Sequence, residues 1–543
     1  MRKRFTNNNG VTVNAVAGTY VVLLGMNATE QARKGLLGFA IWRNDITENQ
    51  QYWLAGFKTF KDTLPSPKPG TLVSTEQHPV QGFLWGDYTA KPNHQYSYKV
   101  VPVYGTPANL IYGDPVIADV STENEDLGKH AIYFNRGVAG SQAYVRKFGD
   151  KKPKDAGPAA YQWLSRGAEE AILKYIGQAN SAEYSLRAAV YEFSWMPVLQ
   201  AFQSARKSGA DVKIVYDCRK AEPHTTSDAC ITKAGIGDLM IPRKANPSYI
   251  AHNKFIVLLK NNKPVKVLSG STNFTEGGIF GQSNVVHVIS DPDIAAQYLA
   301  YWELLAVDTD AKVLRPLNVT QTPDPVQASA GISPIFSPRT SLNVLNWYSE
   351  QMDKAAKSSG FTAAFGVNKT IAAVLGSNKV NFRYVMLEKT GDTYDQFSAN
   401  PNNYISIGAV LGSAAVGDLD FQQWVKESLS NLNENVNYLH TKYLFIDPLS
   451  DNPLVISGSA NFSNASTINN DENMLLIKGD TVVADIYLGE FMRLWNHFYF
   501  RDIANKYASK ATAGAAYLSP DDTWTEKYYG GAFQKTTERE LFA

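Results

Sequence analysis

The chain has 543 residues, a formal net charge of +1 and 44% hydrophobic residues. It is too long for one ordinary domain and has the composition of a soluble globular protein. The near-zero charge gives the whole molecule no electrostatic footprint for nucleic acid, although a local basic cleft stays open, and the absence of about 18 consecutive apolar residues predicts no membrane-spanning helix.

Residues 1–122 are expected to form β structure. Short apolar strands are predicted at 19–24 and 38–43, and residues 96–104 alternate apolar and polar side chains with the period of two that is typical of a strand. Turn-forming Pro, Gly and Asn residues lie between these segments. The segment is interpreted as a spacer or packing domain rather than a binding module.

Basic residues precede an apolar stretch at 11–26, as they do in a signal peptide. Polar residues interrupt this stretch and no Ala-x-Ala follows it, so a strand is the preferred interpretation. A secreted or periplasmic protein is the expectation for localisation, with a cytoplasmic one as the alternative. Cys218 and Cys230 flank a polar loop, and the sequence leaves a disulfide and two free thiols equally open.

The next part of the chain, residues 123–325, alternates helices and strands. A helical pattern from Pro158 to Tyr175 precedes a strand at 186–193, a helix at 198–207 and a strand at 212–216. Strand, helix and strand joined by short turns form a βαβ unit, which predicts parallel pairing.

Residues 326–505 repeat this plan, with helices predicted at 343–357 and 370–375 and strands at 361–365 and 382–387. In each half a long polar connection, 218–249 and then 388–418, separates the βαβ unit from the next strand. Connections of this length are usually functional, so both are predicted to be flaps over a site. The aromatic tail, 506–543, is expected to pack back on the body formed by the two halves.

Two segments repeat one pattern of chemistry-bearing residues. His252-Asn253-Lys254 is followed by Gly270-Ser271-Thr272-Asn273, and His440-Thr441-Lys442 is followed by Gly458-Ser459-Ala460-Asn461 at identical spacings. Two such half-sites facing each other would give one pocket with two imidazoles, two ammonium groups and two amides. That set suits a phosphodiester, which needs a nucleophile on one side and a proton donor on the other.

This pattern resembles the signature of the phospholipase D superfamily, His-x-Lys-x4-Asp followed by Gly-Ser-x-Asn. The second copy matches in full with Asp447, whereas Leu259 stands at that position in the first copy. The resemblance covers about residues 130–500. It implies an α/β fold in which two pseudo-symmetric mixed-sheet halves form one catalytic body. An all-β sandwich resembling fibronectin type III, with Tyr96 as its tyrosine corner, would precede that body.

The resemblance also implies roles for the repeated residues. One histidine would attack phosphorus and form a phosphohistidine, and the other would protonate the leaving oxygen and then activate water or an alcohol. The nonbridging oxygens would be held by Lys254, Lys442, Asn273 and Asn461. The remaining motif residues are expected to act in catalysis (Asp447) or in substrate binding (Gly270, Ser271, Gly458 and Ser459). No metal site and no cofactor is expected for the chemistry.

Glu472 lies 32 residues after His440, and Asn284 lies 32 residues after His252. In this family a carboxylate near this point binds the far ring nitrogen of the catalytic histidine. We therefore expect Glu472 to support His440 and Asn284 to support His252. Because a carboxylate favours the imidazolium form, His440 is predicted to be the general acid and His252 the nucleophile.

The predicted substrate is a glycerophospholipid at a membrane or micelle surface, whose head group a monomeric enzyme would hydrolyse or transfer to another alcohol. The near-neutral charge argues against duplex DNA, and the aromatic connections suit a lipid–water interface. The alternative is a nuclease or other phosphodiesterase acting on nucleic acid with the same two histidines. A non-catalytic binding protein that uses the sandwich is a distant third.

Overall fold

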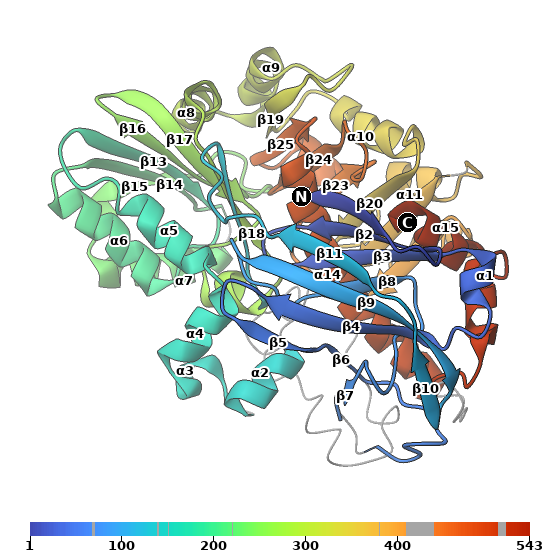
Figure 1. The fold of residues 1–543 in the computed structure, drawn as a ribbon. Helices are drawn as coiled ribbons and strands as arrows, with labels where there is room; N and C mark the ends of the chain where they lie inside the picture. Colours follow the sequence, from blue (N-terminus) through green and yellow to red (C-terminus); the bar gives the residue numbers. More distant parts are fainter. Residues whose placement is uncertain are drawn as a thin grey trace.

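The protein is described by a computed structural model over residues 1–67, 71–137, 141–149, 151–219, 221–379, 381–408, 439–508 and 517–543. Two antiparallel sheets formed by the N-terminal residues lie against a body that contains two seven-stranded mixed sheets (Figure 1). The α/β class and the division into an all-β region and two similar halves agree with the sequence-based expectation.

The N-terminal sheets are antiparallel and are joined by a shared apolar core. The first has the order β1-β2-β3-β8, and the second has the order β10-β9-β4-β5 with β11 also paired to β9. Their strands are β1 Arg2–Thr6, β2 Val11–Ala17, β3 Val22–Ala28, β4 Gly38–Asp45, β5 Gln50–Trp53, β8 Leu84–Asp87, β9 Gln95–Thr106, β10 Asn109–Tyr112 and β11 Val116–Ser121. The short elements α1 Glu30–Arg33, β6 Ala55–Gly56 and β7 Val73–Ser74 connect them.

Two details of this region match the predictions. The apolar stretch at 11–26 forms the paired strands β2 and β3, so the strand interpretation is correct. The hydroxyl oxygen of Tyr96 accepts a hydrogen bond from the backbone N–H of Lys91 at 2.8 Å. A tyrosine bonded to backbone a few residues upstream is the arrangement of a tyrosine corner.

The sheet of the first half has the order β12-β18-β17-β16-β13-β14-β15. Its strands are β12 His130–Phe134, β13 Tyr184–Val190, β14 Asp211–Asp217, β15 Met240–Arg243, β16 Lys254–Lys260, β17 Lys263–Gly270 and β18 Val285–Ile289. The helices are α2 Ser141–Phe148, α3 Pro153–Ala156, α4 Pro158–Ser165, α5 Ala168–Ile176, α6 Met196–Lys207, α7 Ala221–Ala234, α8 Pro292–Ala306 and α9 Ala311–Gln321, with short turns η2 Gly237–Leu239 and η3 Gly277–Gly281. Strands β13 and β14 pair in parallel across α6, as predicted.

The second half has the same strand order, β19-β25-β24-β23-β20-β21-β22. Its strands are β19 Gly331–Ser337, β20 Ser358–Ala363, β21 Phe382–Leu387, β22 Asn403–Ile407, β23 Tyr443–Ile446, β24 Leu454–Gly458 and β25 Glu472–Lys478. The helices are α10 Asn343–Asp353, α11 Lys369–Leu375, α13 Asn464–Ile468 and α14 Thr481–Ala508, with the turn η4 Tyr394–Gln396. In both sheets, the parallel and antiparallel pairings fall at corresponding positions.

The prediction that residues 218–249 form a flap is wrong. Residues 218–249 contain α7, η2 and β15, and β15 extends the sheet in parallel beside β14. The cause is the apolar side chains of Ile231, Ile236 and Leu239, which are buried in the core of the first half. In the second connection β22 takes the place of β15, and residues 409–418 lie outside the described residues.

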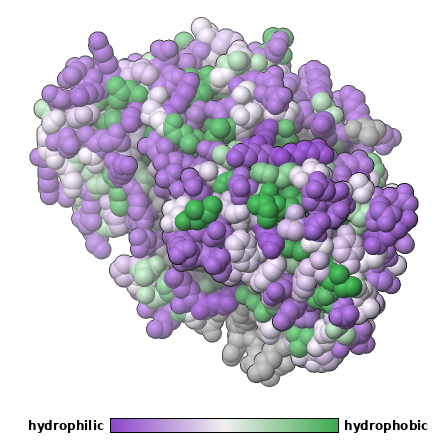
Figure 2. Space-filling view, viewed as in Figure 1, coloured by the Kyte–Doolittle hydropathy of each residue, from purple (hydrophilic) through white to green (hydrophobic). Residues whose placement is uncertain are grey.

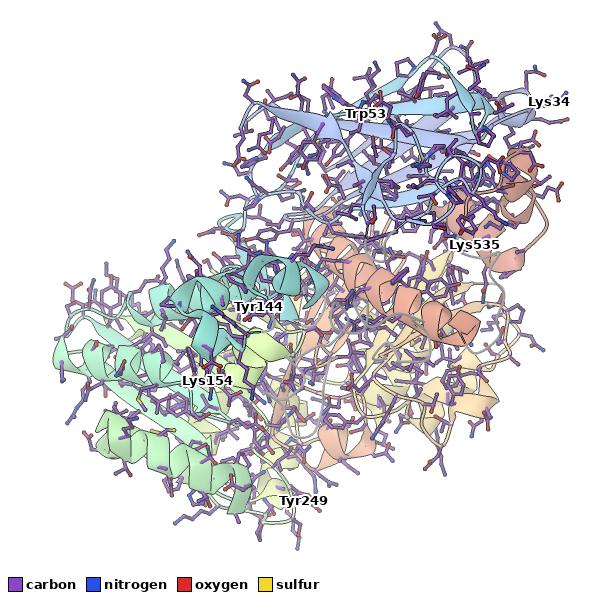
Figure 3. The ribbon with its side chains drawn as sticks, turned by 90° about the horizontal axis from the view of Figure 1, so that it is seen from below. Lys34, Trp53, Tyr144, Lys154, Tyr249 and Lys535 are labelled. Atoms are coloured by element: carbon purple, nitrogen blue, oxygen red, sulfur yellow. The ribbon has the colours of Figure 1, made fainter. Side chains whose placement is uncertain are left out.

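The tail contains η8 Asp522–Tyr528 and α15 Phe533–Phe542 and contacts two parts of the molecule. Trp524 stacks on Phe83 of the N-terminal region with ring centroids 5.2 Å apart. Glu538 accepts a hydrogen bond from Tyr384 of the second half at 2.9 Å. In Figure 3 the tail, marked by Lys535, lies beside both the N-terminal sheets and the second half.

The surface and the thiols complete the description. The face in Figure 2 is mainly hydrophilic, with apolar patches separated by polar side chains. Among the described residues, no helix has the length and apolarity needed to cross a membrane. Cys218 and Cys230 are both free thiols, which decides between the two alternatives left by the sequence.

Candidate active site

The two repeated motifs meet where the halves touch. An isolated β-bridge joins Ala251 to Asp471, and a second one joins Ser283 to Leu439. These bridges occupy corresponding positions in the two halves. Each places the residue before a motif histidine beside the segment that enters the last antiparallel strand of the opposite half.

The histidines are consequently paired crosswise. His252 Nδ1 lies 2.8 Å from Glu472 Oε2, and His440 Nδ1 lies 2.8 Å from Asn284 Oδ1. The prediction that Glu472 supports His440 and that Asn284 supports His252 is therefore wrong. The sequence spacing identified the right residues, but the ring partner of each histidine comes from the other half.

The serines of the two motifs explain this exchange. Ser459 donates to Glu472 at 2.6 Å, and Ser271 donates to Asn284 at 2.7 Å, each within its own half. These bonds orient the carboxylate and the amide across the interface. The serines thus position the histidine partners, which differs from the predicted role of binding substrate directly.

Gly270 and Gly458 allow the close approach of neighbouring strands. A Cβ on Gly270 would lie 2.2 Å from the carbonyl oxygen of Val285, and one on Gly458 would lie 2.2 Å from that of Asn473. No side chain fits at either position. The two glycines are accordingly required by the backbone, a different role from the predicted substrate binding.

Burial lowers the pKa of His252 to about 4, although Glu472 opposes the shift by favouring the charged ring. Burial, together with Lys442 and Lys254, holds the pKa of His440 well below its ordinary value. Both rings are neutral near pH 7 without substrate. Since their Nδ1 atoms face acceptors, the protons lie on Nδ1 and the Nε2 lone pairs are available.

The lysines lie beside the histidines, as predicted. Lys254 Nζ donates to the carbonyl oxygen of His252 at 2.5 Å, and Lys442 Nζ donates to that of His440. Burial lowers the pKa of Lys254 to about 7, against the pull of Glu472 and Glu192, and burial and Lys254 hold that of Lys442 well below its usual range. An anionic ligand bound beside these two lysines would favour their charged forms.

Each motif asparagine has a buried Oδ1 atom without a hydrogen-bond partner among the described residues. Asn273 Nδ2 donates to Glu192 Oε2 at 2.6 Å, and its buried Oδ1 finds no hydrogen-bond partner among the described residues. The Oδ1 atom of Asn461 likewise lacks a partner in the described part of the chain. Glu192 was not predicted from the sequence.

A comparison with known protein families finds a match in each half. Residues 175–305 and 407–495 match the family model described as a cardiolipin synthase, PLD-like domain. One segment of each half is therefore similar to the PLD-like domain of the phospholipase D superfamily. Members of that superfamily process phosphodiesters. No curated protein matches the chain.

Several solved structures are similar to the phospholipase D-like body. Polyphosphate kinase from Porphyromonas gingivalis is 12% identical with a TM-score of 0.40, covering 62% of this chain and 48% of that one. Phosphatidylserine synthase from Haemophilus influenzae Rd KW20 is 12% identical with a TM-score of 0.40, covering 64% and 91%. Nuc, a phospholipase D family member from Salmonella typhimurium, is 30% identical with a TM-score of 0.22, covering 26% and 88%.

One motif residue of the phospholipase D signature lies away from the histidines. Asp447 follows β23, and its carboxylate accepts hydrogen bonds from the backbone N–H groups of residues 356–358 at 2.7–2.9 Å. Seven residues of extended chain place it roughly 20 Å from His440. The predicted catalytic role of Asp447 is therefore wrong, and Leu259 at the matching position is buried in an apolar cluster.

The structure adds two carboxylates that sequence reasoning missed. Asp217 accepts from the N–H of Ala251, and Glu388 accepts from that of Leu439, each at 2.8 Å. Asp217 is the last residue of β14, Glu388 directly follows the corresponding strand β21, and each fixes the residue before a motif histidine. Their different side chains and the unequal loops hid this repeat in the sequence.

A buried ion-pair network crosses the interface beside His252. Asp471, next to Glu472, binds Arg219 at 2.7 Å and Arg243 at 3.0 Å, and all three side chains are buried. The backbone oxygen of Asp471 also accepts from the His252 N–H at 2.9 Å. The corresponding residue in the other half-site is the uncharged Ser283.

Proposed function

We propose that this chain is a phosphodiesterase of the phospholipase D type that hydrolyses the head group of glycerophospholipids, or transfers it, through a phosphohistidine. The observation that carries the proposal is the pair of buried imidazoles with Nδ1 engaged and Nε2 available. Two lysines flank them. Fixed positive charges aimed at the nonbridging oxygens stabilise the charge of the transition state.

In this mechanism His252 Nε2 attacks phosphorus while the bond to the leaving oxygen breaks. His440 Nε2 gives that oxygen a proton. The same nitrogen then takes a proton from water or an alcohol, whose oxygen attacks phosphorus and releases His252. Binding of the phosphodiester anion beside His440 favours the protonated ring that the first step needs.

His252 remains the proposed nucleophile, but for a reason opposite to the sequence-based one. Attack through Nε2 leaves a ring that still carries a proton on Nδ1 and therefore gains positive charge. Glu472, which contacts that nitrogen, stabilises this charge. Asn284 offers His440 orientation without a full charge.

Two observations support a lipid over nucleic acid as the substrate. The formal net charge of +1 provides no general attraction for polyanions. Phe365, which follows β20 at the same sheet edge as the motif residues, is 53% exposed. A ring at this edge would contact the apolar part of a lipid whose phosphodiester binds at the histidines.

The test compares release of the head group from phosphatidylcholine and phosphatidylethanolamine vesicles with cleavage of single- and double-stranded DNA. We expect lipid hydrolysis, and we expect His252→Ala to reduce it by about 10⁴-fold or more because the nucleophile is lost. His224→Ala, which changes a histidine on α7 that contacts Asp228 and Tyr216, is the matched control. Cleavage of DNA alone would replace the lipid with nucleic acid as the substrate.

A further inference from the structure

The two halves carry opposite chemistry at one equivalent position of the site. Strands β13 and β20 end at Val190 and Ala363, and in each half a helix begins six residues later, at Met196 and Lys369. The second residue after the strand is Glu192 in the first half and Phe365 in the second.

The strand registers place these two residues beside the motifs. Val190 pairs with Lys254 in the antiparallel ladder of β13 and β16. Phe361 pairs with Leu444 in the ladder of β20 and β23, so Ala363 comes opposite Lys442. Two residues further on, Glu192 lies on the side of His252 and Phe365 on the side of His440.

The contacts of Glu192 confirm that it lines the site. Its Oε2 accepts from Asn273 Nδ2 at 2.6 Å, and its charge raises the pKa values of both Lys254 and Lys442 against the effect of burial. The ring centroid of the neighbouring Tyr191 lies 4.9 Å from the ring centroid of His252. Lys254 Nζ lies 5.1 Å from the same Tyr191 centroid.

The amide oxygen of Asn273 is a second hydrogen-bond acceptor beside the Glu192 carboxylate. Because Asn273 gives a donor to Glu192, its Oδ1 is left as a buried acceptor without a partner among the described residues. Asn273 is 4% exposed, so bulk water does not satisfy that atom. A carboxylate, a carbonyl oxygen and an aromatic face together form a wall that suits a positively charged hydrogen-bond donor.

We propose that Glu192 and Asn273 recognise the ammonium of an amino-alcohol head group, with phosphatidylethanolamine as the representative substrate, while Phe365 contacts the apolar part of the lipid. This inference rests on the proposed function and adds the class of head group. A phosphodiester that enters the site would be oriented by Glu192 and Asn273 on one side and by Phe365 on the other. The two-fold repeat of the motifs alone gives no such orientation.

The experiment measures kcat/KM for phosphatidylethanolamine and for phosphatidylglycerol, which lacks the ammonium, in vesicles that are otherwise identical. In the wild-type protein the first lipid is expected to be preferred. Glu192→Gln keeps the size of the side chain and an acceptor for Asn273 but removes the charge. We expect the preference to fall about tenfold or more, the effect of losing one charge-assisted hydrogen bond.

The matched control is Glu183→Gln, an exposed carboxylate before the opposite end of β13, which should keep the wild-type preference. If Glu192→Gln lowers kcat/KM equally for both lipids, Glu192 only positions Asn273 and the inference is overturned. If the wild-type protein releases no head group from either lipid, the proposed function itself fails. These two outcomes are distinct because the first requires measurable hydrolysis.

A second variant tests the other wall. Phe365→Ala should raise KM for long-chain lipid vesicles more than for a short-chain lipid below its micellar concentration, because the ring contacts only the apolar part. Val326→Ala, at a side chain that is 97% exposed in the connection between the halves, is its control. An equal change for both lipids would remove Phe365 from the proposal.

Discussion

The ring of His252 contacts a charged partner, whereas the ring of His440 contacts a neutral one. Glu472 faces the first ring, and Asn284 faces the second at the same distance of 2.8 Å. Asp471, next to Glu472, forms ion pairs with two arginines, whereas Ser283, next to Asn284, is uncharged. A two-fold fold thus contains an asymmetric electrostatic environment, which suits a reaction in which one histidine bonds to phosphorus and the other moves a proton.

The most sensitive test of this comparison replaces the charged partner by a neutral one. Glu472→Gln leaves an amide beside His252, and we expect kcat/KM to fall by about 10²- to 10⁴-fold because the positive ring of the intermediate loses its counter-charge. Asn284→Ala, which removes only a neutral acceptor beside His440, should cost about tenfold. Steady-state kinetics on one lipid substrate measures both, and equal losses would contradict unequal roles.

The reverse change should sharpen the comparison through pH dependence. Asn284→Asp places a carboxylate at His440 Nδ1, which raises the pKa of His440. A general acid is active only while it is protonated, so the fall of kcat at high pH should move to higher pH in this variant. The pH profiles of kcat for the variant and the wild-type protein measure this shift. A shift of the low-pH limb alone would mean that His440 acts as the base.

The loss of the charge on Asp447 should have the smallest effect, and on stability alone. Asp447→Asn keeps a residue that tolerates the positive φ of 45° but removes the charge that binds three backbone N–H groups. The free energy of unfolding is expected to fall by about 1–2 kcal/mol, measured by urea denaturation. Since Asp447 lies far from the histidines, kcat/KM should stay at the wild-type value; a loss above tenfold would restore its catalytic role.

Much of the fold could be predicted because its signals are local. The hydrophobic pattern predicted the strand at 382–387 with the bounds observed for β21, and the βαβ units followed from short turns. The segment at 218–249 was missed because its helix has few apolar residues, and only the burial of Ile231, Ile236 and Leu239 against distant strands makes it part of the core. Polar composition did not distinguish it from a loop.

The site shows a different limit. Residue types and spacings identified both histidines, both lysines and both of the side chains that contact the rings. They did not show which partner belongs to which ring, because spacing along one copy says nothing about contacts between copies. Glu192 and Phe365 escaped notice for a related reason: their equivalence depends on strand registers, and the two residues share no chemistry.

Because of the crosswise pairing, the two repeated segments depend on each other. After a duplication, one copy is ordinarily free to change while the other keeps the original activity. Here His252 depends on Glu472 and His440 depends on Asn284, so a substitution in either copy alters the histidine of the other. Divergence such as Glu472 against Asn284 is therefore a joint property of the pair, because each histidine depends on a residue of the other copy.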